Sequence, residues 1–132
     1  MSQLVLDTLT GLPIPKQTRE IVREERKREE LATSICILCG ILAVIQILDG
    51  VLTAMGIARF GLSIEGNPLV RAVMLQFGYV PALILTKSVA LLIIAGIAKF
   101  GLQYSWVTKA LATLITVYMV AAIIPWVTIL LS

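Results

Sequence analysis

Three long hydrophobic segments constrain this chain of 132 residues more than any other feature. They cover about residues 33–58, 80–98 and 106–131. A helix of about 20 apolar residues, rising about 1.5 Å per residue, crosses the roughly 30 Å hydrocarbon core of a bilayer. The composition agrees, because 58% of the residues are hydrophobic and a soluble domain of this length needs more polar surface. We therefore predict an all-α integral membrane protein with three transmembrane helices.

The first 32 residues have a different composition and are predicted to form a cytoplasmic segment ahead of a transmembrane domain at 33–132. Pro13 and Pro15 favour an extended lead-in over residues 1–15. Thr18 is placed to cap a charged helix over 19–31, and no breaker separates that helix from the first span. We expect no cleavable signal peptide, because this segment has no uninterrupted apolar stretch.

The charged helix carries both signs of charge in nearly equal number. Six of the eleven basic residues and five of the eight acidic residues lie in 16–31. Pairs such as Glu24–Arg28 and Glu20–Arg23 have the spacing of favourable helix-surface pairs. A helix of this kind is no polybasic arm, so we expect no nucleic-acid partner despite the net charge of +3.

The distribution of basic residues over the whole chain predicts the orientation. With three crossings, the N-terminal segment and the second loop share one side of the membrane. That side holds eight basic residues and the first loop holds only Arg59 and Arg71. Cytoplasmic loops carry the excess of Lys and Arg, which favours the inner (plasma) membrane with a cytoplasmic N-terminus and an outside C-terminus.

The first loop contains the strongest local signal in the chain. Asn67 and Pro68 form a good helix start, because Asn caps with its side-chain oxygen and Pro tolerates the first helical position. Apolar residues then recur at helical spacing until Gly78, which is a typical stop. We predict a short amphipathic helix over 69–77, lying in the outer interface or folded back on the spans.

The third span is predicted to be an apolar companion of the other two. Trp106 and Trp126 near its ends are typical of interfacial anchors, and Pro125 should kink its last part. The segments 56–62 and 96–102 are nearly identical, Gly-Ile-Ala-Arg/Lys-Phe-Gly-Leu. We interpret both as helix endings in which glycine takes the left-handed conformation, rather than as a duplicated hairpin.

Two charged residues fall well inside the predicted spans. A charge at this depth costs at least about 2.5–3.5 kcal/mol unless it is paired or hydrated. Asp49 and Lys87 lie at similar depths on adjacent antiparallel helices, so an ion pair between them is predicted. If the short helix folds inward, a polar cluster results, made of Asp49, Thr53, Glu65, Asn67 and Lys87. Such a cluster serves either to fasten the helices together or to bind an ion, proton or ligand.

The order of these residues resembles a known family. Asp49 and Thr53, then Glu65-Gly-Asn-Pro-Leu69, then Lys87 are similar to the pattern of the DUF5658 family of small prokaryotic membrane proteins. Members carry an aspartate, a Glu-x-Asn-Pro-Leu loop and a lysine in a similar order. The resemblance covers about residues 45–92. It implies that the polar cluster is a unit, and it supplies no activity because the family's function is unknown.

Catalysis and metal binding find little support in the sequence. The chain has no histidine, which removes the commonest metal ligand and general base. Cys36 and Cys39 lie one turn apart in a hydrophobic span without a second pair, so we interpret them as packing residues. We expect no cofactor, no metal and no enzymatic activity.

Two functions remain as hypotheses. The first is a non-catalytic accessory or structural subunit of a larger membrane complex, in contact with lipid and other membrane subunits, whose 16–31 helix could dock a cytoplasmic partner. The alternative is an oligomeric small transporter or channel that uses the Asp49–Lys87 pair, because three helices enclose a passage only at an interface between copies.

Overall fold

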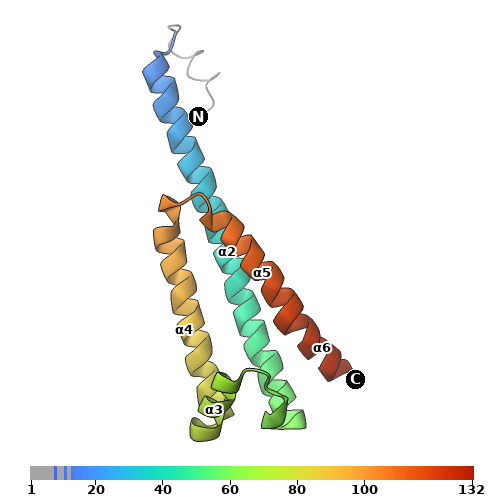
Figure 1. Ribbon diagram of the computed structural model, residues 1–132. Helices are drawn as coiled ribbons and strands as arrows, with labels where there is room; N and C mark the ends of the chain where they lie inside the picture. The colour runs from blue at the N-terminus through green and yellow to red at the C-terminus, as the bar shows by residue number, and fades with distance from the viewer. Residues whose placement is uncertain (1–7, 9–10, 12) are drawn as a thin grey trace.

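The computed structural model describes residues 8, 11 and 13–132, and the regular elements in this part of the chain are all helices (Figure 1). The long helices are α2, α4 and the pair α5–α6. The elements are α2 (Lys16–Phe60), η1 (Leu62–Ile64), α3 (Pro68–Phe77), α4 (Tyr79–Phe100), η2 (Gly101–Gln103), α5 (Val107–Tyr118), η3 (Met119–Ile123) and α6 (Ile124–Leu131).

The charged segment and the first hydrophobic segment form one continuous helix. α2 has 45 residues, a length of about 68 Å at 1.5 Å per residue. Its charged end extends beyond the other helices (Figure 1). The predicted cap at Thr18 is wrong: α2 begins at Lys16 directly after Pro15, two residues before Thr18, and has no side-chain cap.

The predicted ion pairs along the charged helix are also absent. The Lys87–Asp49 pair is the only ion pair in the part of the chain that the structure describes. The residues Glu24–Arg28 and Glu20–Arg23 therefore have the sequence spacing of helix-surface ion pairs, but their charged groups are not in contact. Long side chains on an exposed helix lose rotamer entropy when they pair, and the gain in water is only a few tenths of a kcal/mol.

α2 is the central helix and packs against both α4 and α5. One apolar cluster joins these three helices near the α4–α5 connection. It contains Ile35, Cys39, Leu42, Ile94, Val107 and Leu111. A second cluster joins α2, α3 and α4 at the opposite end and contains Ile57, Met74, Ala82 and Leu83. Between the two clusters α4 and α6 diverge, and the polar residues lie in that gap (Figure 1).

The short helix α3 forms as predicted. Asn67 lies at its N-cap and accepts hydrogen bonds from the backbone N–H groups of Leu69 and Val70, at 3.0 and 3.4 Å. Pro68 is its first residue. Gly78 ends it with φ 87°, a conformation that disfavours residues with a Cβ atom. α4 follows at once, so α3 and α4 form a tight corner against the end of α2 (Figure 1).

The two similar segments end their helices in different ways. Gly61 has φ 86°, as the left-handed prediction requires. Gly101 has φ −67° and ψ −16°, so the left-handed prediction is wrong at this position. A Cβ atom on Gly101 would lie 3.0 Å from Val107 Cγ1, a tight contact, so the packing of the α4–α5 connection favours a small residue here.

The third hydrophobic segment is interrupted before Pro125. The α-helical pattern of α5 changes to the π-helix η3 and resumes in α6, which has Pro125 near its start. Proline lacks an N–H group and crowds the preceding turn, so local widening ahead of it is expected. Trp106 is exposed, as an interfacial anchor should be. Trp126 is not a simple anchor, because its ring packs on Gly56 of α2.

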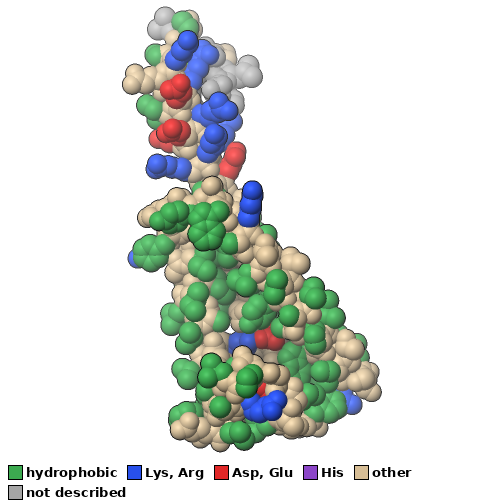
Figure 2. Space-filling model, viewed as in Figure 1, with side chains coloured by type: hydrophobic (Ala, Val, Ile, Leu, Met, Phe, Trp, Pro, Cys, Tyr) green, Lys and Arg blue, Asp and Glu red, His purple; other side chains and the backbone are tan. Residues whose placement is uncertain are grey.

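Three of the helices are long and apolar enough to cross a membrane: Lys16–Phe60, Tyr79–Gln103 and Val107–Leu131. Most of their large hydrophobic side chains are exposed rather than packed inside the chain (Figure 2). The predicted spans at about 33–58 and 80–98 fall within these helices, and the span at about 106–131 begins one residue before Val107. The all-helical fold class is therefore confirmed.

Candidate functional site

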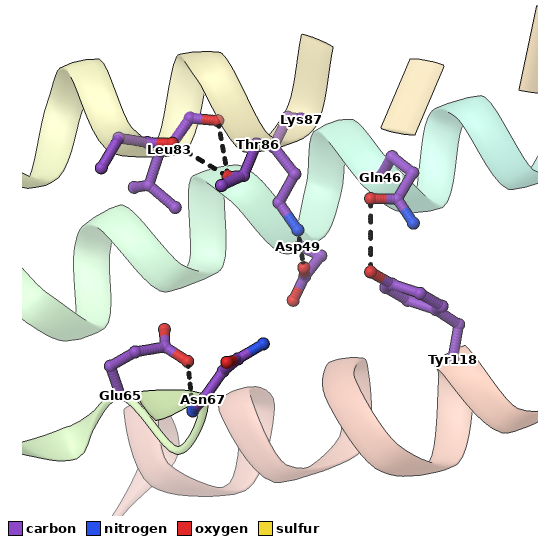
Figure 3. A network of polar contacts seen from close by, with 9 residues as sticks. Gln46, Asp49, Glu65, Asn67, Leu83, Thr86, Lys87 and Tyr118 are labelled. Carbon is purple, nitrogen blue, oxygen red and sulfur yellow. Dashed lines mark hydrogen bonds and ion pairs between the residues drawn. The ribbon is translucent and has the colours of Figure 1, made fainter. Parts of the chain in front are cut away.

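The predicted ion pair is present. The Lys87 ammonium of α4 contacts the Asp49 carboxylate of α2 (Figure 3). Asp49 precedes the end of α2 by about 16 Å, and Lys87 follows the start of α4 by about 12 Å. The aliphatic part of Lys87 passes over Gly50, since a Cβ atom there would lie 3.4 Å from Lys87 Cγ. Lys87 therefore packs directly over the backbone of α2 at Gly50 on its way to Asp49.

Asp49 belongs to a polar stripe on α2. Gln46, Asp49 and Thr53 are only 3%, 6% and 4% exposed, and they are the buried polar residues of the described chain. Their spacing of three and four residues places them on one face of the helix. This face points into the gap between α4 and α6, so the stripe forms the floor of the site.

The loop before α3 covers one end of this floor. The Glu65 carboxylate accepts a hydrogen bond from the Asn67 backbone N–H at 2.9 Å. Arg71 of α3 fastens the loop, because its guanidinium donates to the backbone carbonyls of Glu65 and Ser63. Arg71 therefore forms no ion pair with the Glu65 carboxylate. That carboxylate is half-buried and faces the same space as Asp49 (Figure 3).

The third hydrophobic segment contributes to the site as well. The Tyr118 hydroxyl at the end of α5 donates to Gln46 Oε1 at 3.4 Å, a long hydrogen bond. Its ring centroid lies 5.9 Å from the Lys87 ammonium, within the range of a cation–π contact. Tyr118 thus joins the polar floor on α2 to the ion pair, and the third segment is more than an apolar companion.

These groups line a partly open cavity of about 470 Å³. Its polar lining comes from α2, α4, α5 and the loop, and comprises Gln46, Asp49, Thr53, Glu65, Asn67, Thr86, Lys87 and Tyr118. Its apolar wall comes largely from η3 and α6 and includes Ala121, Ala122, Pro125, Trp126 and Ile129. Figure 2 shows basic and acidic atoms inside a hollow of an otherwise hydrophobic face. This volume lies within the range of small-molecule sites.

Several polar atoms in this cavity have no protein partner. The Thr53 hydroxyl, the second oxygen of Asp49 and the amide nitrogen of Gln46 make no hydrogen bond in the described chain. The second carboxylate oxygen of Glu65 is unpaired too. Thr86 is satisfied locally, because its hydroxyl donates to the carbonyl oxygens of Ala82 and Leu83. The cavity therefore presents unused hydrogen-bonding capacity in a largely buried setting.

All five residues of the predicted cluster line this cavity: Asp49, Thr53, Glu65, Asn67 and Lys87. The sequence reasoning missed Gln46, Tyr118 and Arg71. Gln46 was detectable, because it lies three residues before Asp49 on the face that also carries Thr53. Tyr118 had a weaker signal, as a single polar ring in an apolar segment. The described residues include no group of three His, Cys, Asp or Glu side chains placed to hold a metal.

Comparison with known proteins identifies the family. The family model described as "Domain of unknown function (DUF5658)" matches residues 40–131. The chain belongs to the DUF5658 family. The match exceeds the 45–92 region on which the resemblance rested, and it includes the third hydrophobic segment with Tyr118 and Trp126. Every residue that lines the cavity thus lies inside the DUF5658 region, whereas most of the charged end of α2 lies outside it.

No curated protein and no solved structure matches this DUF5658 chain.

Proposed function

We propose that this DUF5658 protein is a multi-pass membrane protein that binds a small ligand in the cavity between its spans, without catalysing a reaction. The observation that carries the proposal is the cavity of about 470 Å³, into which polar atoms of Gln46, Asp49 and Thr53 without protein partners open. These residues are buried, but their unpaired atoms remain accessible from the cavity, since the Thr108 hydroxyl is the buried side-chain polar atom without a partner in the described chain. A ligand in the cavity could therefore form hydrogen bonds with them.

The distribution of apolar side chains supports placement in a membrane. The three long helices expose most of their large hydrophobic residues, which is unfavourable in water and favourable in lipid. The charged end of α2 and the α4–α5 connection lie at one end, where most basic residues are found (Figure 2). That distribution supports the proposal of a cytoplasmic N-terminus. The cavity then lies between the bilayer centre and the outer surface.

A purely structural role accounts for only part of this site. Besides the apolar clusters, the Asp49–Lys87 pair is the polar contact that joins α2 to α4 in the described chain. Thr53 and Glu65 have no part in that pair, yet both face the cavity. A site that served only to join helices would be more stable if it were filled with apolar side chains. The open volume and the unused polar atoms therefore favour ligand binding.

Filling the cavity tests this proposal. Ala90 of α4 lines the cavity, whereas Ala95 of α4 is exposed on the same helix. We expect Ala90→Leu to abolish retention of small molecules that wild-type protein carries through purification in lipid nanodiscs, as identified by mass spectrometry. The matched variant Ala95→Leu should retain them. Equal retention by all three proteins, or none by the wild type, would contradict the proposal.

A second candidate function, an accessory subunit of a membrane complex, is favoured by the charged end of α2. Lys16, Arg19, Arg23 and Arg26 recur at spacings of three and four residues, along one side of a helix that extends beyond the other helices (Figure 2). None of them forms an ion pair in the described chain. A cytoplasmic partner with an acidic surface would complement this side.

Neutralising the basic side tests this second function. We expect the variant with Arg19, Arg23 and Arg26 changed to Gln to lose a stoichiometric partner during purification in mild detergent. The matched variant with Glu24, Glu25 and Glu29 changed to Gln should keep it. A wild-type protein that purifies as a pure homo-oligomer would contradict the accessory role and favour an oligomeric transporter.

A further inference from the structure

We propose that the ligand of this cavity is an organic monocation, a protonated amine that carries an apolar group. The inference rests on the proposed function, and it names the class of ligand from the charges and hydrogen bonds of the site.

The cationic and helix-end donors around the cavity are already engaged. The Lys87 ammonium contacts Asp49, and Arg71 donates to loop carbonyl groups. The N–H groups at the start of α3, which have no acceptor within the helix, donate to the Asn67 side chain. The Asn67 N–H donates to the Glu65 carboxylate. An anion would have to displace one of these contacts. The site is therefore poorly prepared for an anionic ligand.

The acceptors, in contrast, are only partly used. Asp49 and Glu65 each have one carboxylate oxygen in a contact with the protein and one without a protein partner. Thr53 is 4% exposed, lines the cavity and makes no hydrogen bond in the described chain. A protonated amine brings several N–H donors on one positive centre. It matches acceptors that come from α2 and from the loop.

The charge balance points in the same direction. The charged residues that line the cavity are Asp49, Glu65 and Lys87, so this lining has one more negative than positive charge. Arg71 is not part of the lining, and its guanidinium donates to the Glu65 and Ser63 carbonyl oxygens. Unbalanced charge in surroundings of low polarity is costly, and a monocation would remove it. Lys87 shows that the site accepts an ammonium group, because its own ammonium lies against the Asp49 carboxylate and over the Tyr118 ring.

The remaining walls favour an organic cation over a bare inorganic ion. The cavity of about 470 Å³ is far larger than a metal ion, and its η3–α6 wall is apolar and includes the Trp126 ring. The charged atoms of the cavity are visible through the hydrophobic face in the space-filling view (Figure 2), so the cavity opens to the side for a molecule with an apolar part. The aromatic rings of Tyr118 and Trp126 suit both a cation and an apolar group.

Three probes of similar size separate charge from shape: 2-phenylethylammonium, 2-phenylethanol and 3-phenylpropionate. We would measure their binding by calorimetry to the full chain in zwitterionic phosphatidylcholine nanodiscs, with empty nanodiscs as the blank. We expect the ammonium compound to bind most tightly. Glu65→Gln keeps the acceptor for the Asn67 N–H and removes only the charge. This substitution should lower the affinity for the ammonium compound about tenfold or more and leave the affinity for 2-phenylethanol unchanged.

A matched control variant and the competing cations complete the binding measurements. Glu29→Gln removes the same charge on the exposed part of α2 and should change no affinity. Equal binding of the alcohol and the ammonium compound, tighter binding of 3-phenylpropionate, or an unchanged affinity in Glu65→Gln would overturn the cation assignment and leave the ligand cavity in place. Loss of ammonium binding in sodium chloride or in potassium chloride, but not in the other salt at equal ionic strength, would assign the site to an inorganic cation instead. No binding of any probe above the blank would contradict the proposed function itself.

Discussion

Removing the charge of either Asp49 or Lys87 should destabilise the helix bundle, and the two substitutions should differ in cost. The two side chains are 9% and 22% exposed, so both are largely removed from solvent. Loss of one partner from a buried pair costs about 3–5 kcal/mol, because the other charge is left uncompensated. Lys87→Gln leaves the charge of Asp49, the more buried partner, uncompensated. Its cost should therefore lie near the upper end of this range, at about 4–5 kcal/mol.

Asp49→Asn should cost less than Lys87→Gln. It leaves Lys87, whose longer side chain is more exposed and can turn within the cavity, so we expect about 3 kcal/mol. The double variant leaves no charge unpaired and should cost only about 1–2 kcal/mol. The coupling energy between the two sites is then several kcal/mol, well above the few tenths expected for independent sites.

Cys39 offers a direct assay of this prediction. It is 5% exposed in the cluster that joins α2, α4 and α5, whereas Cys36 is exposed. In a Cys36→Ser background, maleimide labelling of Cys39 in bicelles reports opening of the bundle. The labelling rate gives the free energy of opening when opening and closing are fast. Glu29→Gln serves as the control and should shift this free energy by less than about 0.5 kcal/mol.

The reasoning would be refuted by additive costs in the double variant, because additivity means that the pair does not interact. It would also be refuted if Asp49→Asn cost more than Lys87→Gln, since the argument assigns the larger cost to the more buried remaining charge.

Three further predictions use the same protein. Gly56→Ala should destabilise the bundle by about 1–3 kcal/mol, measured by Cys39 labelling, because the new Cβ atom would clash with the Trp126 ring. In a background free of native cysteines, Ser132→Cys should react with an impermeant maleimide on intact cells, and Gln17→Cys only after lysis. 2-Phenylethylammonium at ten times its Kd should stabilise wild type by about 1.4 kcal/mol and Lys87→Gln by more, because its ammonium replaces the lost partner of Asp49.

Each of these has a clear contrary result. An unchanged opening free energy in Gly56→Ala would mean that Trp126 does not pack on α2. Labelling of the cysteine at position 17 from outside would reverse the proposed orientation. Equal stabilisation of wild type and Lys87→Gln by the ammonium compound would place its charge away from Asp49.

The sequence predicts the fold well because the strongest signals are local. Helices of hydrophobic residues follow from length and composition, and the Asn67-Pro68 start and Gly78 stop of α3 follow from backbone chemistry at those residues. The Asp49–Lys87 pair was predictable because two charges at similar depth on adjacent helices have few other partners.

The parts that the sequence did not predict depend on packing between helices. Trp126 has the position of an interfacial anchor, and only the approach of α6 to Gly56 turns its ring inward. Gly101 occurs in the same local sequence as Gly61 but adopts a right-handed conformation, since the chain continues there into the helical turn η2. The cavity requires the divergence of α4 and α6, which no local pattern encodes.

The central claim, that the cavity between α4 and α6 holds a small cationic ligand, is tested most directly by locating the probe. Intermolecular nuclear Overhauser effects between 2-phenylethylammonium and the protein in nanodiscs would do so. The account predicts contacts from the probe to the ring protons of Tyr118 and Trp126, both lost in Ala90→Leu. Contacts only to lipid-facing residues such as Leu92, or contacts that persist in Ala90→Leu, would contradict it.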